Sequence, residues 1–366
     1  MLARVWQNLK VETGPGADAA QLADAWRALG ASALDPAAFQ SVDYLLPILE
    51  QHSDGKVITV RSLGQLIMAV PAQSNLGIQS SFASPFVASG LPQVLGQASD
   101  VGVMAFVNSL KVPFRFRALP ADSKFFALLQ NAAPQFQEMK RWQRAALLIR
   151  GTYEQWLVDN LDQKRRKEFK RLRTRLSEQG EVKLESLSHS SNLDGFVNDL
   201  LELEGQGWKG SRGTAMNADQ RTTTMFRAIC ANLHHSGSLR FWTLKFNGKP
   251  IASLFGMIEG AQGWIVKIAY DEAFAKFSPG VMLVFDATEA LFAEPQLKLV
   301  DSCAIPGHPM IDRIWRDRID MVDVLVAPAQ VSQLQFATTV AVLKLHAKLR
   351  DVAKSLFYRI SKRKKS

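Results

Sequence analysis

One stretch of the sequence, from Gln262 to Phe292, constrains the fold more than any other. It opens with an almost entirely apolar run, Trp264 to Tyr270, which is typical of a buried strand, and a polar turn then leads into an apolar helix. The tripeptide Ser278-Pro279-Gly280 stands where that helix begins. The sequence therefore predicts a buried strand that is followed, within a few residues, by a helix start.

The start of this helix also has the chemistry of an anion site. A serine can cap the first turn, a proline fits the first helical position, and Gly280 lets a ligand approach the backbone closely. Free backbone N–H groups and the helix dipole together favour an anion there by about 0.3 to 2 kcal/mol. A pyrophosphate suits such a site, although the same tripeptide also starts helices that bind no ligand.

Three motifs in a fixed order resemble the CelD/BcsL family. They are Gly207-Trp208-Lys209-Gly210 with Gly213-Thr214-Ala215, the run from Lys267 to Gly280, and the run from Pro306 to Trp315. The family comprises acetyltransferase-like proteins of the GNAT superfamily, is named for cellulose biosynthesis and is related to the Fem peptidyltransferases. The similarity covers about residues 151–327, and it implies an acyltransferase that uses acyl-CoA.

Length and composition indicate a globular chain without a metal or disulfide framework. The 366 residues are enough for two domains and a tail, and 47% of them are hydrophobic, which predicts buried cores. Cys230 and Cys303 are the only cysteines and lie far apart without a CxxC pattern, so neither a disulfide nor a zinc site is expected. No run reaches the roughly 18 apolar residues of a spanning helix, and no secretion signal opens the chain. A cytoplasmic location is therefore expected.

The net charge of +10 is concentrated in two segments. Residues 140–175 hold twelve Lys or Arg against four Asp or Glu, and residues 341–366 hold nine against one, so each segment carries +8 and the remainder carries about −6. The basic run at 164–175 is either a solvated helix face or a rim that attracts phosphate-rich or carboxylate-rich ligands. Aromatic residues are not interleaved with it for base stacking, which disfavours sequence-specific nucleic-acid binding.

The first 150 residues have the pattern of an α/β unit, but no chemistry stands out in them. Apolar spacing predicts helices at 19–29, 36–50, 97–110 and 124–131, and strands at 57–60, 65–70, 114–118 and 144–149. The strands at 57–60 and 65–70 flank Ser62-Leu63-Gly64 as a hairpin. One long helix is then expected from Gly151 to Gly180.

The order of elements after Glu181 is that of a GNAT domain, as the resemblance implies. Strands are predicted at 182–187, 239–246, 250–258, 264–270, 298–301 and 321–326, and helices at 193–206, 218–235 and 278–292, with a hairpin turn at Asn247-Gly248. The hairpin at Gly64 echoes the one at Gly248. We therefore predict an α/β fold of tandem GNAT-like units with mixed central sheets, the first unit lacking a Ser-Pro-Gly helix start.

These patterns divide the chain into three parts. Residues 1–150 are expected to form a degenerate N-terminal GNAT-like unit, residues 151–327 the GNAT acetyltransferase-like domain, and residues 328–366 a basic amphipathic tail. The tail should contain a helix from about 331 to 360. It could pack across both domains, or dock on an anionic membrane surface, where each basic residue contributes about 1 kcal/mol.

The resemblance implies that an acyl-CoA thioester lies where two parallel strands separate, and that an amine or hydroxyl attacks it directly. Strand alternation would place Ile265, Lys267, Ala269 and Asp271 on one face, where Lys267 should meet a carboxylate or line a cleft. Tyr270, on the opposite face, could protonate the leaving thiolate or lie in the core. Asp271 or Glu204 could be the base, and either carboxyl would need a raised pKa.

The binding residues follow from the same motifs. The turn that would hold the pyrophosphate comprises Lys276, Phe277, Ser278, Pro279, Gly280, Val281 and Met282. The acceptor side would comprise Trp208, Lys209, Thr214, His308, Asp312 and Trp315, although the first three could form a rigid turn and His308 could cap a helix. Cys303 has no evident His base and is expected to be a small buried residue, and His234 and His235 are expected to cap a helix.

The sequence thus predicts an acyltransferase that moves an acyl group, acetyl in the simplest case, to an amine or hydroxyl of a saccharide or polysaccharide precursor in cellulose or exopolysaccharide biosynthesis. Acyl-CoA is the expected co-substrate, with no metal, and peripheral contact with the inner membrane surface is possible through the tail. The alternatives are a Fem-like transferase that uses aminoacyl-tRNA, and an inactive accessory protein of an exopolysaccharide machine.

Overall fold

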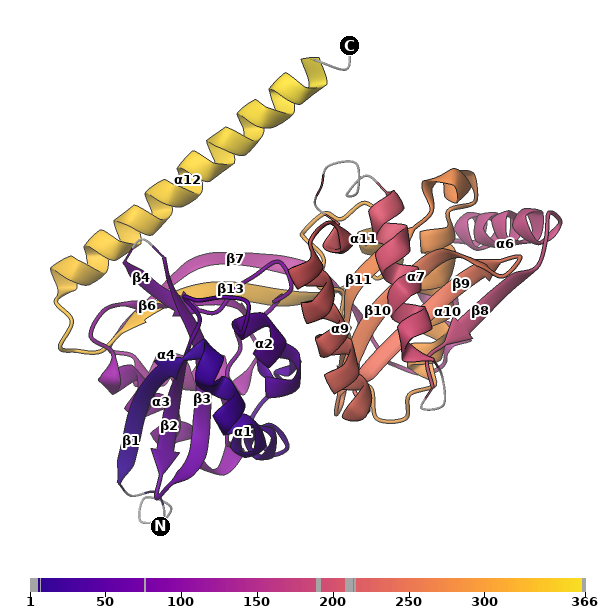
Figure 1. Cartoon of the computed structure of the whole chain (residues 1–366). Helices are drawn as coiled ribbons and strands as arrows, with labels where there is room; N and C mark the ends of the chain where they lie inside the picture. Colours follow the sequence, from indigo (N-terminus) through magenta and orange to yellow (C-terminus); the bar gives the residue numbers. More distant parts are fainter. Residues whose placement is uncertain are drawn as a thin grey trace.

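The computed structural model describes residues 6, 8–75, 77–188, 192–207, 213 and 215–363. Figure 1 shows two α/β halves side by side and a long helix at the C-terminal end. The first half contains β1 (Leu9–Pro15), η2 (Gly16–Leu22), α1 (Ala23–Gly30), η3 (Ala38–Gln40), α2 (Val42–Leu49), β2 (Lys56–Ser62), β3 (Gln65–Asn75), β4 (Ile78–Ser81), β5 (Gln93–Val94), η4 (Gly96–Ala98), α3 (Ser99–Ser109), β6 (Phe114–Pro120), α4 (Lys124–Ala132) and β7 (Gln135–Leu148).

The second half has the same kinds of elements in a similar order. It contains α5 (Tyr153–Asn160), α6 (Gln163–Ser177), β8 (Val182–Ser186), α7 (Leu193–Gln206), η5 (Met216–Ala218), α9 (Gln220–His235), β9 (Leu239–Phe246), β10 (Lys249–Glu259), β11 (Gln262–Tyr270), η6 (Glu272–Phe277), α10 (Pro279–Phe292), β12 (Leu299–Asp301), α11 (Ile311–Ile314) and β13 (Asp317–Ala327), and α12 (Gln333–Arg363) follows.

One continuous mixed sheet runs through both halves in the order β1-β2-β3-β4-β6-β13-β7-β12-β11-β10-β9-β8, with β5 beside β3. The two ends of this order mirror one another. In the first half β4 pairs in parallel with β6, and in the second half β11 pairs in parallel with β12. The other pairs along the path are antiparallel.

The two halves are repeats of one structural unit, as predicted. Two helices, an antiparallel hairpin, a strand, a helix and a parallel strand follow one another in each half. The hairpin turns correspond residue by residue: Leu63-Gly64 and Asn247-Gly248 both have two successive positive φ angles, 49° and 87° in the first and 46° and 77° in the second. Such a turn matches the twist of the strands it joins. The predicted α/β fold of tandem units with mixed sheets is confirmed.

The last strand of each half completes the sheet of the other half. β7 ends the first half, yet Ala146 to Leu148 pair with β12 of the second half. β13 ends the second half, yet it pairs with β6 of the first. β7 and β13 also pair with each other along most of their length. This strand exchange places two long antiparallel strands at the centre of the molecule, where Figure 1 shows them crossing from one half to the other.

The two faces of the sheet in the second half pack against two different hydrophobic cores. Side chains of α7 and α9 pack with those of the first half, and this core includes Trp264 of β11, whose indole contacts the Phe39 ring edge-on at 6.2 Å between centroids. Side chains of α10, α5 and α11 pack on the other face of the sheet. β11 therefore separates a face that looks towards the first half from a face covered by α10.

Two sequence predictions need correction. The single helix expected from Gly151 to Gly180 is two helices, α5 and α6, because Leu161 is extended and the Asp162 carboxylate accepts a hydrogen bond from the Arg165 N–H at 2.8 Å as the N-cap of α6. The last strand of the first half is much longer than the predicted 144–149, since β7 starts at Gln135. The boundaries of the three predicted parts of the chain stay a prediction.

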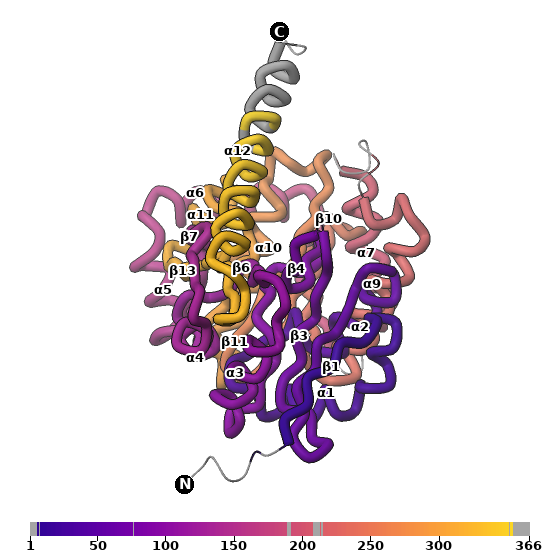
Figure 2. Tube along the Cα trace, turned by 90° about the vertical axis from the view of Figure 1, so that its left-hand side faces the viewer, coloured from indigo at the N-terminus to yellow at the C-terminus, as the bar shows by residue number. Residues whose placement is uncertain are grey.

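α12 contacts β7 of the first half and then extends beyond the body of the molecule without packing across both halves. Figures 1 and 2 show it leaving the first half near β6 and β13 and projecting beyond the body of the molecule. Several of its apolar side chains are exposed, namely Leu334, Val342, Leu345, Leu349 and Val352. The last four are spaced by three or four residues, which places them on one stripe of the helix.

Candidate active site

The parallel pair β11 and β12 opens into a gap within the second half. The two strands are in register from Gln262 opposite Leu299 to Trp264 opposite Asp301. β12 ends there, whereas β11 continues to Tyr270. Along residues 265–270, the edge of β11 that faces β12 has no strand partner in the described part of the chain. Backbone N–H and C=O groups in this stretch are available to a ligand that enters between the strands.

α10 begins beside this gap, but its first turn differs from the predicted cap. Ser278 takes up a left-handed conformation (φ 55°), and its hydroxyl makes no capping hydrogen bond. Instead, the Ser278 carbonyl accepts hydrogen bonds from the N–H groups of Val281 and Met282 at 3.0 and 3.1 Å. Pro279 takes the first helical position as predicted. Among the described residues, the Gly280 N–H has no backbone acceptor, as is usual in the first turn of a helix.

Gly280 and Tyr270 lie in direct contact at this helix start. A Cβ atom placed on Gly280 would lie 3.3 Å from Cδ1 of Tyr270, which leaves no comfortable space for a larger residue. Tyr270 is 41% exposed, so it is not a core tyrosine. Its ring therefore forms one wall of the turn that precedes α10, on the α10 face of β11 as the strand alternation predicts.

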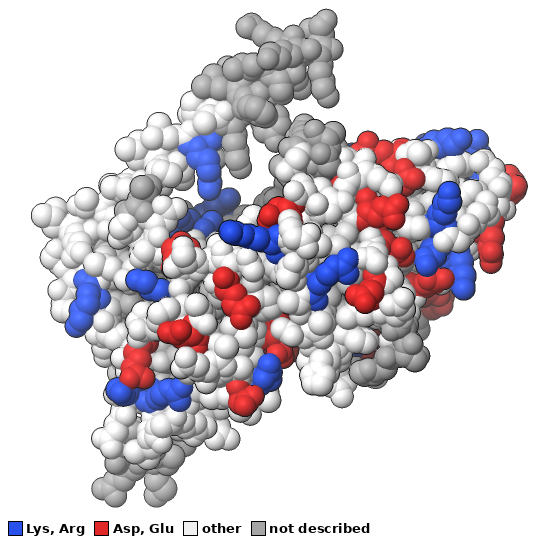
Figure 3. Space-filling view, viewed as in Figure 1, with Lys and Arg blue, Asp and Glu red and all other residues white. Residues whose placement is uncertain are grey.

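Basic side chains surround the start of α10. α6 packs against η6, which leads into the turn, and Figure 3 shows Lys and Arg side chains on the surface in this region. Next to Val281 lies a cavity of about 340 Å³, lined by Leu161, Arg165, Phe169, Val281, Pro309, Met310, Arg313 and Ile314. Two guanidinium groups on an otherwise apolar lining suit a ligand with a flat ring and phosphates. The predicted rim of positive charge thus lies at the predicted anion site.

A β-bulge changes which side chains share a face of β11. Phe255 of β10 is opposite Lys267, but Gly256 is opposite Ile265, so Val266 is an extra residue. Ile265 packs on the α10 side and Val266 on the other. The prediction that Ile265 and Lys267 share a face is therefore wrong, because the bulge interrupts the alternation. The bulge needs a glycine at 256, where a Cβ would lie 2.7 Å from the Trp264 carbonyl oxygen.

Lys267 and Glu204 meet on the face that looks towards the first half. The Lys267 Nζ lies 3.1 Å from Oε1 of Glu204 on α7, and the side chains are 19% and 3% exposed. The Glu204 carboxylate also accepts a hydrogen bond from the Met216 N–H at 3.0 Å. Phe86 of the first half lies against the ammonium, with 5.0 Å between Nζ and the ring centroid. The predicted meeting of Lys267 with a carboxylate is present, and sequence reasoning missed Phe86.

The other predicted acid has a structural role. Asp271 caps η6, because its carboxylate accepts a hydrogen bond from the Ala273 N–H at 2.9 Å. This bond holds Asp271 in the turn after β11, away from the pair formed by Lys267 and Glu204. Of the four predicted catalytic residues, the structure brings together Lys267 and Glu204, places Tyr270 at the helix start and engages Asp271 as a cap.

The residues predicted from the third motif support α11 and the core. The His308 Nδ1 faces the N–H groups of Met310 and Ile311 at 3.3 and 3.4 Å, which is the capping role considered as the alternative. Asp312 accepts from the Gly307 N–H at 2.9 Å. Trp315 is fully buried, and its indole N–H donates to the Thr288 hydroxyl at 3.1 Å. Trp315 was predicted to contact the acceptor, but it packs in the core instead.

Trp208, Lys209 and Thr214, predicted to build the acceptor side, lie outside the described residues. The seven predicted pyrophosphate residues, in contrast, are all described and form the turn at the start of α10. Within that turn Phe277 is buried, and the Lys276 Nζ lies 4.9 Å from the centroid of its ring.

A buried ion pair that sequence reasoning missed joins the two halves where β11 and β12 separate. Nη1 of Arg144, on β7, lies 2.8 Å from Oδ2 of Asp301, the last residue of β12, and the two side chains are 8% and 3% exposed. Arg144 also donates from Nη2 to the Ala88 carbonyl at 2.7 Å, and Asp301 accepts from the Cys303 N–H at 2.8 Å. A lone arginine before an apolar strand segment was the available signal in the sequence.

Cys303 is not an activated nucleophile. Burial, together with the nearby Asp301 carboxylate, raises the pKa of its thiol well above the usual value. A thiol is a weak nucleophile compared with its thiolate. Cys303 is only partly buried, so the expectation of a small buried residue holds in part.

Residues 163–305 match the family model for the acetyltransferase (GNAT) domain. The chain contains a GNAT acetyltransferase domain. The matched residues run from the start of α6 to just beyond β12, so they include the gap, the bulge and the start of α10. As predicted, this is the domain of an acyltransferase, whereas the finer resemblance to the CelD/BcsL family remains a prediction. None of the curated proteins compared with the chain matches it in sequence.

Several solved structures share the fold of both halves of the chain. The crystal structure of FemX has a TM-score of 0.56 at 11% identity, with 84% of this chain and 96% of that chain covered. The structure of L-PGS from Bacillus licheniformis has a TM-score of 0.51 at 9% identity, covering 86% and 98%. A conserved protein of unknown function from Bacteroides thetaiotaomicron has a TM-score of 0.51 at 13% identity, covering 87% and 100%. At these identities the likeness concerns the fold.

No group of three or more His, Cys, Asp or Glu side chains is placed to hold a metal ion in the part of the chain that is described. None of the described helices combines the length and the apolar character that a membrane span needs.

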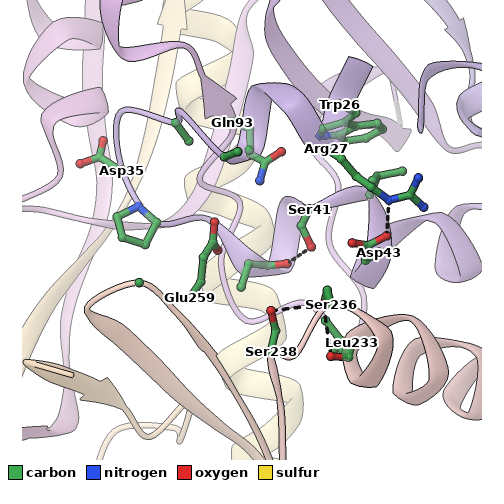
Figure 4. Close-up of a pocket in the computed structure, with 17 residues that line it drawn as sticks. Trp26, Arg27, Asp35, Ser41, Asp43, Gln93, Leu233, Ser236, Ser238 and Glu259 are labelled. Carbon is green, nitrogen blue, oxygen red and sulfur yellow. Dashed lines mark hydrogen bonds and ion pairs between the residues drawn. The ribbon is translucent and has the colours of Figure 1, made fainter. Parts of the chain in front are cut away.

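A second cavity lies between the GNAT domain and the first half, on the side of the β10–β11 turn. It has a volume of about 570 Å³ and is lined from both halves, by residues that include Trp26, Arg27, Asp43, Ser238 and Glu259. Figure 4 shows Glu259 there beside Ser41 and Ser238, while the dashed contact of Arg27 is with Asp43. The Glu259 Oε2 is buried without a hydrogen-bond partner among the described residues. Sequence reasoning missed this carboxyl.

Burial raises the pKa of Glu259 from 4.5 to about 7. A carboxyl whose pKa is higher in the folded than in the unfolded state holds its proton more tightly when folded, so the free energy of unfolding falls as the pH rises from about 4.5 to about 7. The total loss corresponds to about 3 kcal/mol. We expect Glu259→Gln to be more stable than wild type at pH 8 and to lose most of that advantage at pH 5, as measured by urea unfolding at both pH values. An equal difference at both pH values would contradict the raised pKa.

Proposed function

We propose that the protein transfers an acyl group from acyl-CoA to an amine or hydroxyl in the gap between β11 and β12. The observation that carries this proposal is the combination of a parallel strand pair that separates after Trp264 and Asp301 with a helix start at Gly280 directly beside it. The gap offers unpaired backbone groups to a thioester, and the helix start offers an amide to a pyrophosphate. Acyl-CoA carries both groups.

The donor would enter from the α10 face. The Gly280 N–H and the dipole of α10 would bind the pyrophosphate, Tyr270 would flank it, and Arg165 and Arg313 would face the nucleotide from the neighbouring cavity. The thioester carbonyl would then lie against the free edge of β11, where backbone N–H groups stabilise the charge that develops on the oxygen. Residues Lys276 to Met282 thus keep their proposed role in donor binding.

The acceptor would approach from the opposite face, which looks towards the first half. There the nitrogen or oxygen of the acceptor attacks the carbonyl carbon and loses its proton to solvent. The C–S bond breaks, and CoA leaves as a thiolate that takes up a proton. Lys267, which forms an ion pair with Glu204, would stabilise the negative charge on the carbonyl oxygen. Glu204 would position Lys267, and Tyr270 is the proposed proton donor to the thiolate because it is exposed beside the donor turn.

The resemblance to the CelD/BcsL family suggests a saccharide or polysaccharide precursor as the acceptor, in cellulose or exopolysaccharide biosynthesis. Use of acyl-CoA would place the reaction in the cytoplasm. The exposed apolar stripe and the basic residues of α12 support peripheral contact with the inner membrane surface as part of the proposal. An accessory protein that only binds its ligand in the gap is the alternative without catalysis.

A second candidate donor is aminoacyl-tRNA, as in a Fem-like transferase. The observation that favours it is the basic face of α6, where Lys164, Lys167 and Lys170 form no ion pair with another described residue. Such side chains can neutralise a phosphate backbone without reading its sequence. Binding of tRNA would weaken steeply with salt, whereas binding of CoA through one pyrophosphate would depend on salt much less.

Thermal unfolding with CoA, acetyl-CoA and longer acyl-CoAs tests the donor. A ligand at 100 times its Kd adds about 2.7 kcal/mol to the free energy of unfolding, which raises Tm by several degrees. We expect that shift in wild type and its loss in Gly280→Val, because the new side chain would press on Tyr270 and cover the amide. Gly195→Val is the matched control, since Gly195 also lies in the first turn of a helix and its nearest neighbour atom is 3.7 Å from the Cβ position.

The outcome decides between the candidates. A shift with acyl-CoA that Gly195→Val retains and Gly280→Val loses supports the donor site. Its dependence on acyl chain length would identify the acyl group. If no CoA species shifts Tm, acyl-CoA is not the donor, and binding of aminoacyl-tRNA becomes the next measurement.

A further inference from the structure

A strongly basic cavity lies in the first half, where the sequence offered no chemistry. It has a volume of about 520 Å³ and is bounded by the loop at 82–90, by β6 and β7, and by one side of α12. Its cationic side chains are Arg115, Arg117, Lys140, Arg144, Lys344, Lys348 and Arg350, and among the described side chains that line it only Asp323 is acidic. Figure 2 shows α12 in front of this part of the sheet, and Figure 3 shows Lys and Arg side chains where the helix leaves the body.

Most of this positive charge is not neutralised by the protein. Arg115 pairs with Asp323 and Arg144 with Asp301, and the other five cationic side chains of the cavity form no ion pair with a described residue. Nε of Arg115 is also buried without a hydrogen-bond partner among the described residues. Like charges that line one concavity repel one another, so the empty cavity is electrostatically unfavourable and an anion relieves that repulsion.

Arg117 is the central group of the cavity. It lies on β6, two residues from Arg115, and is partly buried. Burial is the main cause that lowers the pKa of its guanidinium. Repulsion from Arg115 and from Arg350 of α12 lowers that pKa further. A guanidinium in this setting has donors without acceptors, which a phosphate group supplies in the matching forked geometry.

The inner end of the cavity lies at the Arg144–Asp301 ion pair, beside the point where the pairing of β11 with β12 ends. Ala88, Arg144 and Cys303 line it there, and Arg144 is bonded to Asp301, at which the β11–β12 pairing ends. The loop at 82–90 also contributes Phe86, which lies against Lys267 on the acceptor face. A ligand held at the outer, basic end of the cavity could therefore extend towards the reacting carbonyl from the side opposite to the donor.

We propose that this cavity binds the phosphate or diphosphate group of the acceptor, with Arg117, Lys344 and Lys348 as the main contacts. The acceptor would thus be a phosphorylated compound, either a soluble nucleoside-diphosphate derivative or a lipid-linked phosphate whose apolar part lies along α12. The role of the ligand as acceptor rests on the proposed acyl transfer. The anion site itself does not.

Calorimetric titration of the full chain with inorganic pyrophosphate at low salt tests the site. We expect Arg117→Gln to weaken binding about tenfold or more, because a charge-assisted contact is lost. The double variant Lys344→Gln/Lys348→Gln should weaken it several-fold, and its exposed helix positions carry little risk to folding. Arg141→Gln is the control, since Arg141 is exposed on β7, pairs with Glu138 and lies outside the cavity.

Two further arms separate this site from the donor site and identify the source of the phosphate. If Gly280→Val still binds pyrophosphate, the pyrophosphate site lies outside the donor turn. If CoA raises the Tm of Arg117→Gln as much as that of wild type, donor binding does not depend on the cavity. Binding of UDP, weakened by Arg117→Gln, would assign a soluble ligand. Sedimentation with phosphatidylglycerol vesicles, weakened by Lys344→Gln/Lys348→Gln and absent with phosphatidylcholine, would assign a lipid.

The proposal is overturned if wild type does not bind pyrophosphate, or if both cavity variants bind it as tightly as Arg141→Gln does. If pyrophosphate binds in the cavity but no CoA species shifts Tm, the anion site stands and the proposed acyl transfer fails.

Discussion

Replacement of Asp301 by alanine is expected to lower the free energy of unfolding by about 3 to 5 kcal/mol, because it leaves the Arg144 guanidinium buried without a counter-charge. The two side chains are 8% and 3% exposed and are joined by a 2.8 Å contact, so solvent replaces the lost carboxylate only poorly. Removal of the carboxylate also leaves the Cys303 N–H without its hydrogen-bond acceptor. Urea unfolding of the variant and of wild type measures the effect.

The control for this variant is Glu138→Ala. Glu138 pairs with Arg141 on the same strand as Arg144, but this pair is exposed, so its removal should cost no more than about 1 kcal/mol. The double variant Arg144→Met/Asp301→Ala should recover part of the lost stability, since neither charge then remains buried. A similar small cost for Asp301→Ala and Glu138→Ala would show that water reaches the pair.

Lys267→Met is expected to reduce the rate of acyl transfer about 10²- to 10³-fold, the usual effect of removing one group that stabilises an oxyanion. The side chain is held in place by Glu204 and Phe86, and Lys267 lies on the stretch of β11 that has no strand partner on its β12 side in the described part of the chain. Its charge would therefore act where the thioester carbonyl is proposed to lie. The measurement is kcat with saturating acyl-CoA, together with a CoA titration to show that donor binding is retained.

Lys245→Met is the control that separates a loss of activity from a loss of stability. Lys245 also lies on a strand, pairs with the carboxylate of Glu185 at 2.8 Å and is 23% exposed, compared with 19% for Lys267, but it is on β9. Both variants should lose some stability, and only Lys267→Met should lose activity. Equal kcat values for the two folded variants would remove Lys267 from the mechanism and leave it as a partner of Glu204.

The local parts of the site were predictable because neighbouring residues determine them. The apolar run that forms β11, the proline at the first position of α10 and the turn at Asn247-Gly248 each depend on a few adjacent residues, and the structure has them where the sequence placed them. The break between α5 and α6 also had a local signal, the N-capping Asp162, which the apolar stripe on both sides concealed.

The missed parts depend on contacts between distant segments. Arg144 and Asp301 are 157 residues apart, and neither residue alone indicates a buried pair. The bulge at Val266 arises from the pairing of β11 with Gly256, which the alternation of side chains along one strand cannot reveal. The first nine residues of β7 were missed because they are largely polar, and what makes them a strand is the partner β13, which lies far along the chain.

The position of β13 also determines when this sheet can be finished during synthesis. β13 lies between β6 and β7, so the strand at the middle of the sheet is the last one that the ribosome delivers. Until residue 327 has emerged, β6 has an open edge, and β7 can pair only with the few residues of β12. Open edges invite pairing with other chains, and such long-range pairing is slow. A nascent chain of this protein therefore depends on its last strand to close both halves at once.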